Sequence, residues 1–199
     1  MDKIKVAITG GPSGGKTTLI ETLKKEFGSQ IKVVPEAASI LYSGGFPRKK
    51  STLARISTQR AIYYTQRELE AIAIGESEKS ILVFDRGSLD SIAYWPNDED
   101  DFFKNIRSTK SEELARYDWV MHLDTASNEN YDLSNPIRTE THTEALLLNE
   151  KIKMAWNGHT RRITIASDGD FLAKITKSIQ VIKSIVKGKS YEDVCKIIS

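Results

Sequence analysis

Short apolar runs alternate along the chain with longer segments in which apolar residues recur every three or four positions. The runs have the length and continuous apolar character of strands buried on both faces, as in a parallel sheet between layers of helices. The predicted strands are 5–9, 31–35, 80–84, 117–123 and 162–166. The periodic segments predict helices at 15–27, 52–78, 87–95, 99–116 with a break, 141–157, 170–187 and 190–198.

A strand followed by a helix, repeated five times, predicts one α/β domain over residues 1–199. The expected architecture is a three-layer α/β/α sandwich with a five-stranded parallel sheet and right-handed crossovers. A chain of 199 residues is long enough to bury a sizeable core without disulfides or a structural metal.

Two polar segments interrupt this pattern. Residues 42–51 are rich in glycine and then strongly basic, with Arg48, Lys49 and Lys50 in succession, and residues 124–141 contain few apolar residues. Both follow strands, where open α/β sheets bind their ligands. Such segments are either solvated connections or binding loops, and we expect 124–141 to be a lid. The basic trio either gathers a phosphate-bearing acceptor or lies in solvent.

Composition and charge exclude several classes of protein. The chain has 29 basic and 27 acidic residues, so its net charge of +2 is too near balance to predict a nucleic-acid or membrane surface. Its single cysteine, Cys195, cannot form an internal disulfide. No run approaches the roughly 18 apolar residues of a membrane helix, and the first residues lack the apolar core of a secretory signal. We therefore expect a cytoplasmic protein with no membrane segment.

The residues between the first predicted strand and the first predicted helix match a phosphate-binding motif. Residues 10–17 read GGPSGGKT, which fits the P-loop pattern G-x-x-x-x-G-K-[ST] in the context it requires. Glycines let the backbone curl so that successive N–H groups point inward, and the amino end of the helix adds partial positive charge. The motif predicts that ATP or GTP binds here, the alternative being a flexible turn with a solvated lysine. The predicted contacts are Gly10, Gly11, Pro12, Ser13, Gly14, Gly15, Lys16, Thr17 and Thr18.

A magnesium ion is expected beside the triphosphate. Lys16 should bridge the β- and γ-phosphates, and the Thr17 hydroxyl should ligate Mg²⁺. Asp85 directly follows four apolar strand residues, where a P-loop protein needs a carboxylate to hold the metal through water. An aspartate at such a position can also be a simple helix cap, so this prediction depends on its pairing with the P-loop.

Absent motifs narrow the class of P-loop protein. A switch GTPase needs an Asn-Lys-x-Asp guanine reader after a later strand, and the sequence has none. Motors of the helicase or AAA type are usually larger and carry added subdomains. The small-kinase plan remains, in which a nucleoside triphosphate and an acceptor meet at the carboxyl edge of the sheet.

Three further side chains fit that plan. Glu36 follows the second strand, where a carboxylate can orient an acceptor hydroxyl or take its proton. Arg86, next to Asp85, can clamp phosphate oxygens. Arg138, within the long polar loop, can swing over the transferring phosphoryl group. The structural alternatives are that Glu36 caps the next helix, Arg86 forms a surface salt bridge and Arg138 lies in solvent.

Six stretches of the sequence, spread over about residues 4–186, carry a resemblance: ITGGPSGGKTTLIETL, VVPEAA, VFDRGSLDSIAY, NPIRTE, LNEKIKMAW and GHTRRITI. Together they resemble the P-loop family that groups the nicotinamide-riboside kinase domain of the bacterial NAD regulator with AAA-labelled ATP/GTP-binding proteins. More distantly, the chain is similar to deoxynucleoside and thymidylate kinases. The resemblance implies sheet order 2-3-1-4-5, Mg-nucleotide binding and phosphotransfer, and it leaves the acceptor open.

Polar residues on the predicted helix 52–78 allow two interpretations. Gln59, Tyr63 and Gln66 share one helical face. In the distantly similar nucleoside kinases a glutamine on this helix reads the acceptor base. The simpler interpretation, which we prefer, is a core helix with a polar flank. The later stretch ASDGDF either cradles the nucleotide base or begins a helix with an aspartate cap.

The sequence as a whole predicts a Mg-dependent kinase for a small acceptor such as a nucleoside or nucleotide. The rival is a nucleotide-binding switch or scaffold that hydrolyses ATP or GTP slowly without an acceptor. A nucleic-acid 5′-end kinase would need a basic groove, and the balanced charge counts against it. The acceptor, the choice between ATP and GTP, and the oligomeric state stay open.

Overall fold

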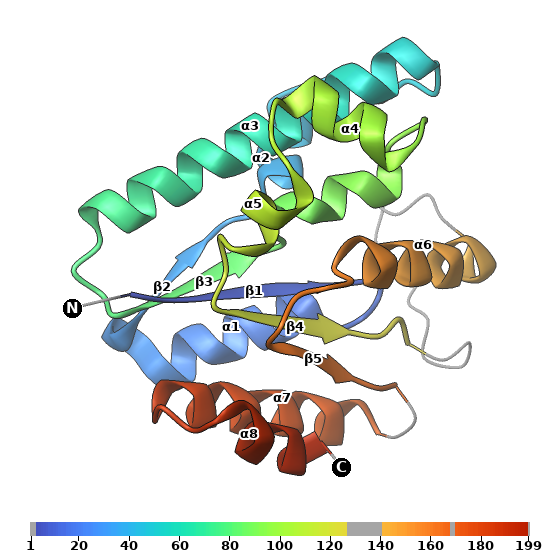
Figure 1. The fold of residues 1–199 in the computed structure, drawn as a ribbon. Coiled ribbons are helices and arrows are strands. Elements are labelled where there is room, and N and C mark those ends of the chain that lie inside the picture. The colour runs from blue at the N-terminus through green and yellow to red at the C-terminus, as the bar shows by residue number, and fades with distance from the viewer. Residues whose placement is uncertain (1–2, 127–140, 168–169, 199) are drawn as a thin grey trace.

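The structure is a computed structural model that describes residues 3–126, 141–167 and 170–198. Its strands are β1 (Ile4–Gly10), β2 (Ile31–Val34), β3 (Ile81–Asp85), β4 (Trp119–Leu123) and β5 (Arg162–Ile165). All neighbouring strands are parallel, and they form one sheet in the order β2-β3-β1-β4-β5 (Figure 1). The predicted five-stranded parallel sheet and its order are therefore confirmed.

Helices cover both faces of this sheet (Figure 1). One face carries α1 (Lys16–Phe27), α7 (Phe171–Val186) and α8 (Tyr191–Ile198). The other face carries α2 (Ala37–Ser43), α3 (Thr52–Glu76), α4 (Glu99–Ile106), α5 (Lys110–Leu114) and α6 (His142–Ala155). This is the predicted three-layer α/β/α architecture. Over the described ranges, none of the helices combines the length and the apolar character needed to cross a membrane.

Four local details differ from or refine the predicted elements. Helix α2 has only seven residues, too few for a periodic pattern to reveal it, and it ends at Gly44. The predicted helix 87–95 is instead a 3₁₀ helix, η2 (Ser88–Tyr94), which ends just before Pro96. The predicted break in 99–116 falls at Arg107, whose left-handed φ of 53° separates α4 from α5. A second 3₁₀ turn, η1 (Gly28–Gln30), links α1 to β2.

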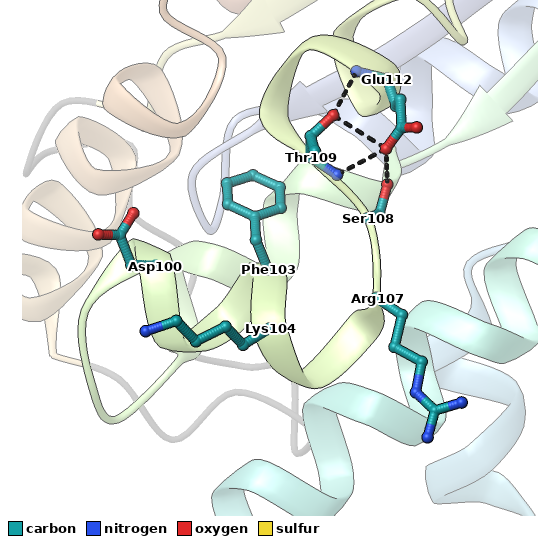
Figure 2. Close-up of a pocket in the computed structure, with 7 residues that line it drawn as sticks. All are labelled: Asp100, Phe103, Lys104, Arg107, Ser108, Thr109 and Glu112. Carbon is teal, nitrogen blue, oxygen red and sulfur yellow. Dashed lines mark hydrogen bonds between the residues drawn. The ribbon is translucent and has the colours of Figure 1, made fainter.

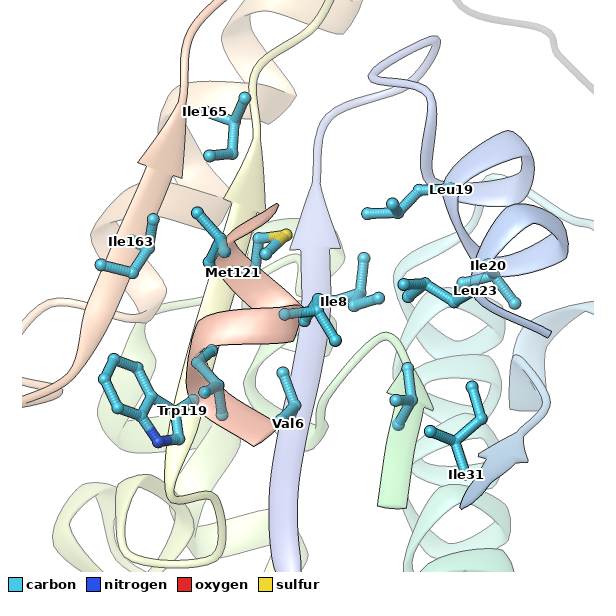
Figure 3. Packing of buried hydrophobic residues seen from close by; sticks show 14 of the residues in the cluster. Val6, Ile8, Leu19, Ile20, Leu23, Ile31, Trp119, Met121, Ile163 and Ile165 are labelled. Carbon is cyan, nitrogen blue, oxygen red and sulfur yellow. The ribbon is translucent and has the colours of Figure 1, made fainter. Parts of the chain in front are cut away.

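Successive residues of β1 pack on opposite faces of the sheet, as the continuous apolar runs predict. Val6 and Ile8 pack with Leu19 and Leu23 of α1 in one cluster (Figure 3). Ala7 points to the opposite face and joins a second cluster under α3, α6 and η2. That second cluster includes Leu82, Phe84, Ile152, Ala155 and Trp156. Buried apolar side chains are packed on both faces, so the sheet is a rigid platform for the loops at its edge.

The carboxyl ends of the three central strands meet at one edge. In the register of the sheet, Ile8 of β1 lies opposite Asp85 of β3 and Met121 of β4. The loop that follows β1 therefore starts between the ends of its two neighbours. This is the edge at which open parallel sheets bind ligands.

Candidate functional site

The P-loop of residues 10–15 curls over the end of β1 because its backbone enters the left-handed region at three positions. These are Gly10 at φ 133°, Ser13 at φ 56° and Gly15 at φ 91°. A Cβ on Gly10 would lie 2.0 Å from the carbonyl oxygen of Leu123 at the end of β4. The glycine at this position is thus required both by its φ and by the close approach of β4.

Helix α1 begins directly from this loop. Gly15 occupies its N-cap position, and no side chain caps the helix. The uncapped N–H groups of the first turn and the positive end of the helix dipole make this a binding point for an anion. Thr17 and Thr18 lie in that first turn with exposed side chains. The predicted nucleotide contacts 10–18 thus lie at the carboxyl edge of the sheet, between the end of β1 and the first turn of α1.

Lys16 folds back over the loop. Its Nζ donates to the carbonyl oxygens of Gly10 at 2.8 Å and of Gly11 at 2.7 Å. Burial, together with the positive charge of Arg86, lowers the pKa of Lys16 to about 7, against the opposing effect of Glu36, Asp90 and Asp85. A polyphosphate beside this ammonium would favour its charged form. The position is therefore suited to an anionic ligand.

Three carboxylates surround Arg86 next to the P-loop. The Arg86 guanidinium pairs with Glu36, which follows β2, and with Asp90 of η2 at 3.2 Å. It also donates to the carbonyl oxygen of Gly10 at 3.5 Å. Asp85, the last residue of β3, is the third carboxylate. We call Glu36, Asp85, Arg86 and Asp90 the carboxylate cluster.

Arg86 adopts a conformation that is uncommon for a non-glycine residue. Its φ is 71°, while its N–H continues the ladder by donating to the carbonyl oxygen of Ile8 at 3.0 Å. Only 19% of its side chain is exposed, so the alternative of a surface salt bridge is wrong. Glu36 occupies the N-cap position of α2, but its side chain makes no capping bond and instead accepts from Arg86 and Ser39.

Glu36 and Asp85, two of the three carboxylates in the cluster, have shifted pKa values of opposite direction. Burial opposes ionisation of Glu36, but the charge of Arg86 and the hydrogen bonds from Ser39 and Arg86 bring its pKa down to about 2. Burial and the nearby Glu36 charge raise the pKa of Asp85 to about 6, against the influence of Arg86 and Lys16. Within the part of the chain that is described, the Asp85 carboxylate makes no hydrogen bond or ion pair.

An unpartnered carboxylate beside a phosphate-binding loop fits a divalent cation. Magnesium keeps several waters and takes only one or two carboxylates from a protein, in addition to substrate phosphates. Asp85 and the exposed Thr17 hydroxyl would fit such a small donor set. Across the described residues, no group of three or more His, Cys, Asp or Glu side chains is arranged to hold a metal alone.

Asp90 is a buried member of the cluster that the sequence reasoning missed. It is 4% exposed, and its Oδ1 accepts from Thr9 at 2.5 Å and from the Trp156 indole at 2.7 Å. Its other oxygen faces Arg86. The spacing of four residues from Arg86 was a usable signal, since it matches a helical ion pair.

Asn149 of α6 is the second missed residue. Its Oδ1 accepts from the backbone N–H of Gly11 in the P-loop and of Thr125 after β4, each at 3.2 Å. No motif or spacing in the sequence connects Asn149 with Gly11, which is 138 residues away.

The remaining predicted site features lie outside the described residues or elsewhere in the chain. Arg138 lies outside the described residues, as does nearly all of the expected lid 124–141. Arg48, Lys49 and Lys50 are exposed, and Arg48 stacks on the Tyr42 ring at 4.1 Å. In the later stretch ASDGDF, Asp170 caps α7 by accepting from the N–H of Ala173 at 3.1 Å.

The polar face of α3 is buried, as a core helix with a polar flank requires. Gln59, Tyr63 and Gln66 are 7%, 1% and 3% exposed. Gln66 donates to Glu70 at 3.0 Å and to the carbonyl oxygen of Arg86 at 3.4 Å. This face therefore reaches the carboxylate cluster.

A separate open hollow of about 540 Å³ lies between α4 and α5 (Figure 2). Three of its polar side chains bond to one another, because Thr109 and Glu112 form a capping box that also involves Ser108. None of its lining residues belongs to the P-loop or the carboxylate cluster. They are Asp100, Phe103, Lys104, Arg107, Ser108, Thr109 and Glu112. We therefore place the functional site at the edge of the sheet.

Comparison with known proteins shows the family and the fold of the chain. A family model described as an AAA domain matches residues 5–174. The chain belongs to this AAA-domain family. The match includes the P-loop, the carboxylate cluster and Asn149.

A solved structure shares the fold of this AAA-domain protein. The structure of deoxyadenosine kinase from M. mycoides with bound dATP aligns with a TM-score of 0.62 at 15% sequence identity. The alignment covers 91% of this chain and 100% of that one. No curated protein gives a significant match. The AAA-domain protein thus has the P-loop fold of the small kinases.

Proposed function

We propose that the protein binds a magnesium nucleoside triphosphate and transfers its γ-phosphoryl group to a small acceptor. The observation that carries this proposal is the convergence of the Lys16 loop and the carboxylate cluster at one edge of the sheet. The Arg86 guanidinium contacts both Glu36 and the Gly10 carbonyl, so the phosphate-binding and acceptor-binding groups share one arginine.

The P-loop is the nucleotide-binding half of the site. Residues Gly10 to Thr18 hold the triphosphate through backbone N–H groups, and Lys16 neutralises charge that develops on the γ-phosphoryl group. Thr17 and Asp85 would hold Mg²⁺, and the ion would supply positive charge that offsets the negative charge of the triphosphate.

The carboxylate cluster is the acceptor half. A Glu36 carboxylate with a pKa near 2 is ionised at neutral pH. It is a weak base but a good hydrogen-bond acceptor, so its role is to orient the acceptor hydroxyl. That role suffices, because phosphoryl transfer through a loose transition state depends mostly on positioning and electrostatics. Arg86, with Arg138 from the lid, stabilises the transferring phosphoryl group.

The acceptor is a nucleoside or nucleotide in this proposal. Support comes from the fold shared with a deoxyadenosine kinase and from α3. Gln66 is engaged by Glu70 and Arg86, whereas the Gln59 side chain makes no hydrogen bond within the described ranges, although it is only 7% exposed. The Gln59 amide is therefore available to a ligand, and the edge of a nucleobase supplies both a donor and an acceptor.

The test is transfer of labelled phosphate from ATP or GTP, with magnesium, to a panel of nucleosides and nucleotides. The proposal predicts a phosphorylated product with one class of acceptor, at a rate that depends on acceptor concentration. Slow release of phosphate that no acceptor accelerates would instead establish the nucleotide-hydrolysing switch or scaffold.

A further inference from the structure

One side of α6 packs against the sheet and η2, and a single residue of its buried stripe is polar. The stripe consists of Ala145, Asn149, Ile152 and Ala155, all at most 3% exposed. An amide in an otherwise apolar stripe loses solvation that its own hydrogen bonds must replace. Its partners therefore indicate why the residue is an asparagine.

The partners fix the orientation of the Asn149 amide. The N–H groups of Gly11 and Thr125 can only donate, so the oxygen Oδ1 faces them. The Nδ2 group donates to the Asp124 carboxylate at 2.9 Å, which can only accept in its ionised form. His122 lies 2.9 Å from Oδ1 through Nε2, so that nitrogen carries the proton.

The contact also leaves no room for another side chain on the loop. A Cβ added to Gly11 would lie 2.8 Å from the Cβ of Asn149 and 2.1 Å from the Oγ1 of Thr125. The start of the P-loop is thus clamped between α6 and the residue that follows β4. An apolar residue at position 149 would fill the space but leave two buried N–H groups without a partner.

The Asn149 side chain is in turn held by the ion pair between Asp124 and Lys153. Lys153, one turn further along α6, contacts the same Asp124 oxygen at 2.7 Å. Burial works against ionisation of Asp124, but the bonds from His122, Lys153 and Asn149 keep its pKa well below the usual range. The Asp124 backbone carbonyl accepts from Lys174 of α7 at 2.5 Å. Helices on both faces of the sheet thus meet at this point.

We propose that Asn149 is a positioning residue that sets the shape of the P-loop for polyphosphate binding. This proposal rests on the proposed function. It adds a chain of contacts that runs from Gly11 through Asn149 to the Asp124–Lys153 ion pair. It assigns to α6 control over the orientation of the Gly11 N–H in the P-loop. Asn149 contacts the loop through the Gly11 N–H, so it acts on nucleotide binding through the loop.

The test compares Asn149→Leu with the matched control Asn105→Leu. Asn105 is also partly buried, but its Nδ2 bonds locally to Asp101 on α4. Calorimetric titration with Mg·ATP and Mg·GTP should show that Asn149→Leu weakens binding at least about tenfold, because an unpaired buried N–H distorts the loop. Asn105→Leu should bind as the parent does.

A double variant that exchanges the side chains at positions 149 and 124 should restore nucleotide binding. Asn149→Asp combined with Asp124→Asn keeps an oxygen toward Gly11 and Thr125 and an N–H donor between the two side chains. It should recover most of the affinity, whereas Asn149→Asp alone, with two carboxylates in contact, should not. Parent-like affinity in Asn149→Leu, or a swap no better than that single variant, would overturn the proposal.

Amide hydrogen exchange tests the role of Asn149 independently of whether the protein binds a nucleotide. The Gly11 and Thr125 amides should be protected in the parent and should exchange faster in Asn149→Leu than in Asn105→Leu. If the parent binds neither nucleotide, the proposed function fails, and these two amides still decide whether Asn149 fixes the loop. Unchanged exchange would overturn its role.

Discussion

Lys16 is the residue on which nucleotide binding should depend most. Its ammonium is buried against the Gly10 and Gly11 carbonyls, beside Arg86. We expect Lys16→Ala to slow phosphoryl transfer by about a hundredfold or more, as the loss of one electrostatic contact to a transition state typically does. Lys24→Ala is the control, since Lys24 lies on the same helix and pairs only with exposed Glu21 among described side chains. Equal rates for parent and Lys16→Ala would refute the assignment.

Glu36 should make stability depend on pH in the acid range. Its pKa is about 2 in the folded protein against an ordinary value of 4.5, so its ionised form stabilises the fold above pH 4.5. That contribution, at most about 3 kcal/mol, is lost as the pH falls from 4.5 toward 2.

The variant that tests this is Glu36→Gln. Its free energy of unfolding and that of the parent are measured by urea denaturation across that pH range. The unfolding free energy of the variant should fall less steeply than that of the parent, because the remaining low-pKa groups such as Asp124 are common to both proteins. Parallel curves would show that the Glu36–Arg86 pair contributes no pH-dependent stability.

The turn from β3 into η2 is held by a buried tyrosine. The Tyr117 hydroxyl accepts from the Ser88 N–H at 2.8 Å and donates to Glu70 of α3 at 2.6 Å. A Cβ on Gly87 would lie 2.5 Å from the Trp156 ring, so the turn is also sterically enclosed. The strained Arg86 conformation is therefore imposed by its surroundings.

Tyr117→Phe tests this support. Removing the hydroxyl leaves the buried Ser88 N–H and Glu70 each short of one partner, which should lower the unfolding free energy by about 1–3 kcal/mol. Tyr64→Phe is the control, because the Tyr64 side chain is 41% exposed and its hydroxyl bonds the Ile106 carbonyl at 3.2 Å; it should change stability by less than about 0.5 kcal/mol. Chemical denaturation measures both, and equal losses would contradict the role of Tyr117.

Local sequence patterns predicted the strands, most of the helices and the P-loop. The contacts between distant segments depend on long-range packing and could not be predicted in this way. The strands were predictable because both their faces are buried, and the P-loop because its whole motif lies in the successive residues 10–17. Helix α2 was too short to show a period. The contact of Asn149 with Gly11 joins segments 138 residues apart, and no local pattern encodes it.

At the scale of the whole molecule, the sheet order explains why distant residues form one site. Placing β1 between β3 and β4 puts the P-loop next to Asp85 on one side and Asp124 on the other. Glu36 follows β2, at the edge beyond β3, and reaches the cluster through Arg86. Sequence analysis predicted this meeting of Lys16, Glu36, Asp85 and Arg86, but not the buried partners Asp90 and Asn149 that hold it in place.

The central claim is that the P-loop holds a nucleoside triphosphate with magnesium. Calorimetric titration of the full chain with ATP and GTP, in magnesium and then in excess EDTA, tests it most directly. The account predicts saturable binding of at least one nucleotide in magnesium, weaker binding in EDTA, and loss of binding in Lys16→Ala. The absence of binding heat from both nucleotides in magnesium would contradict it.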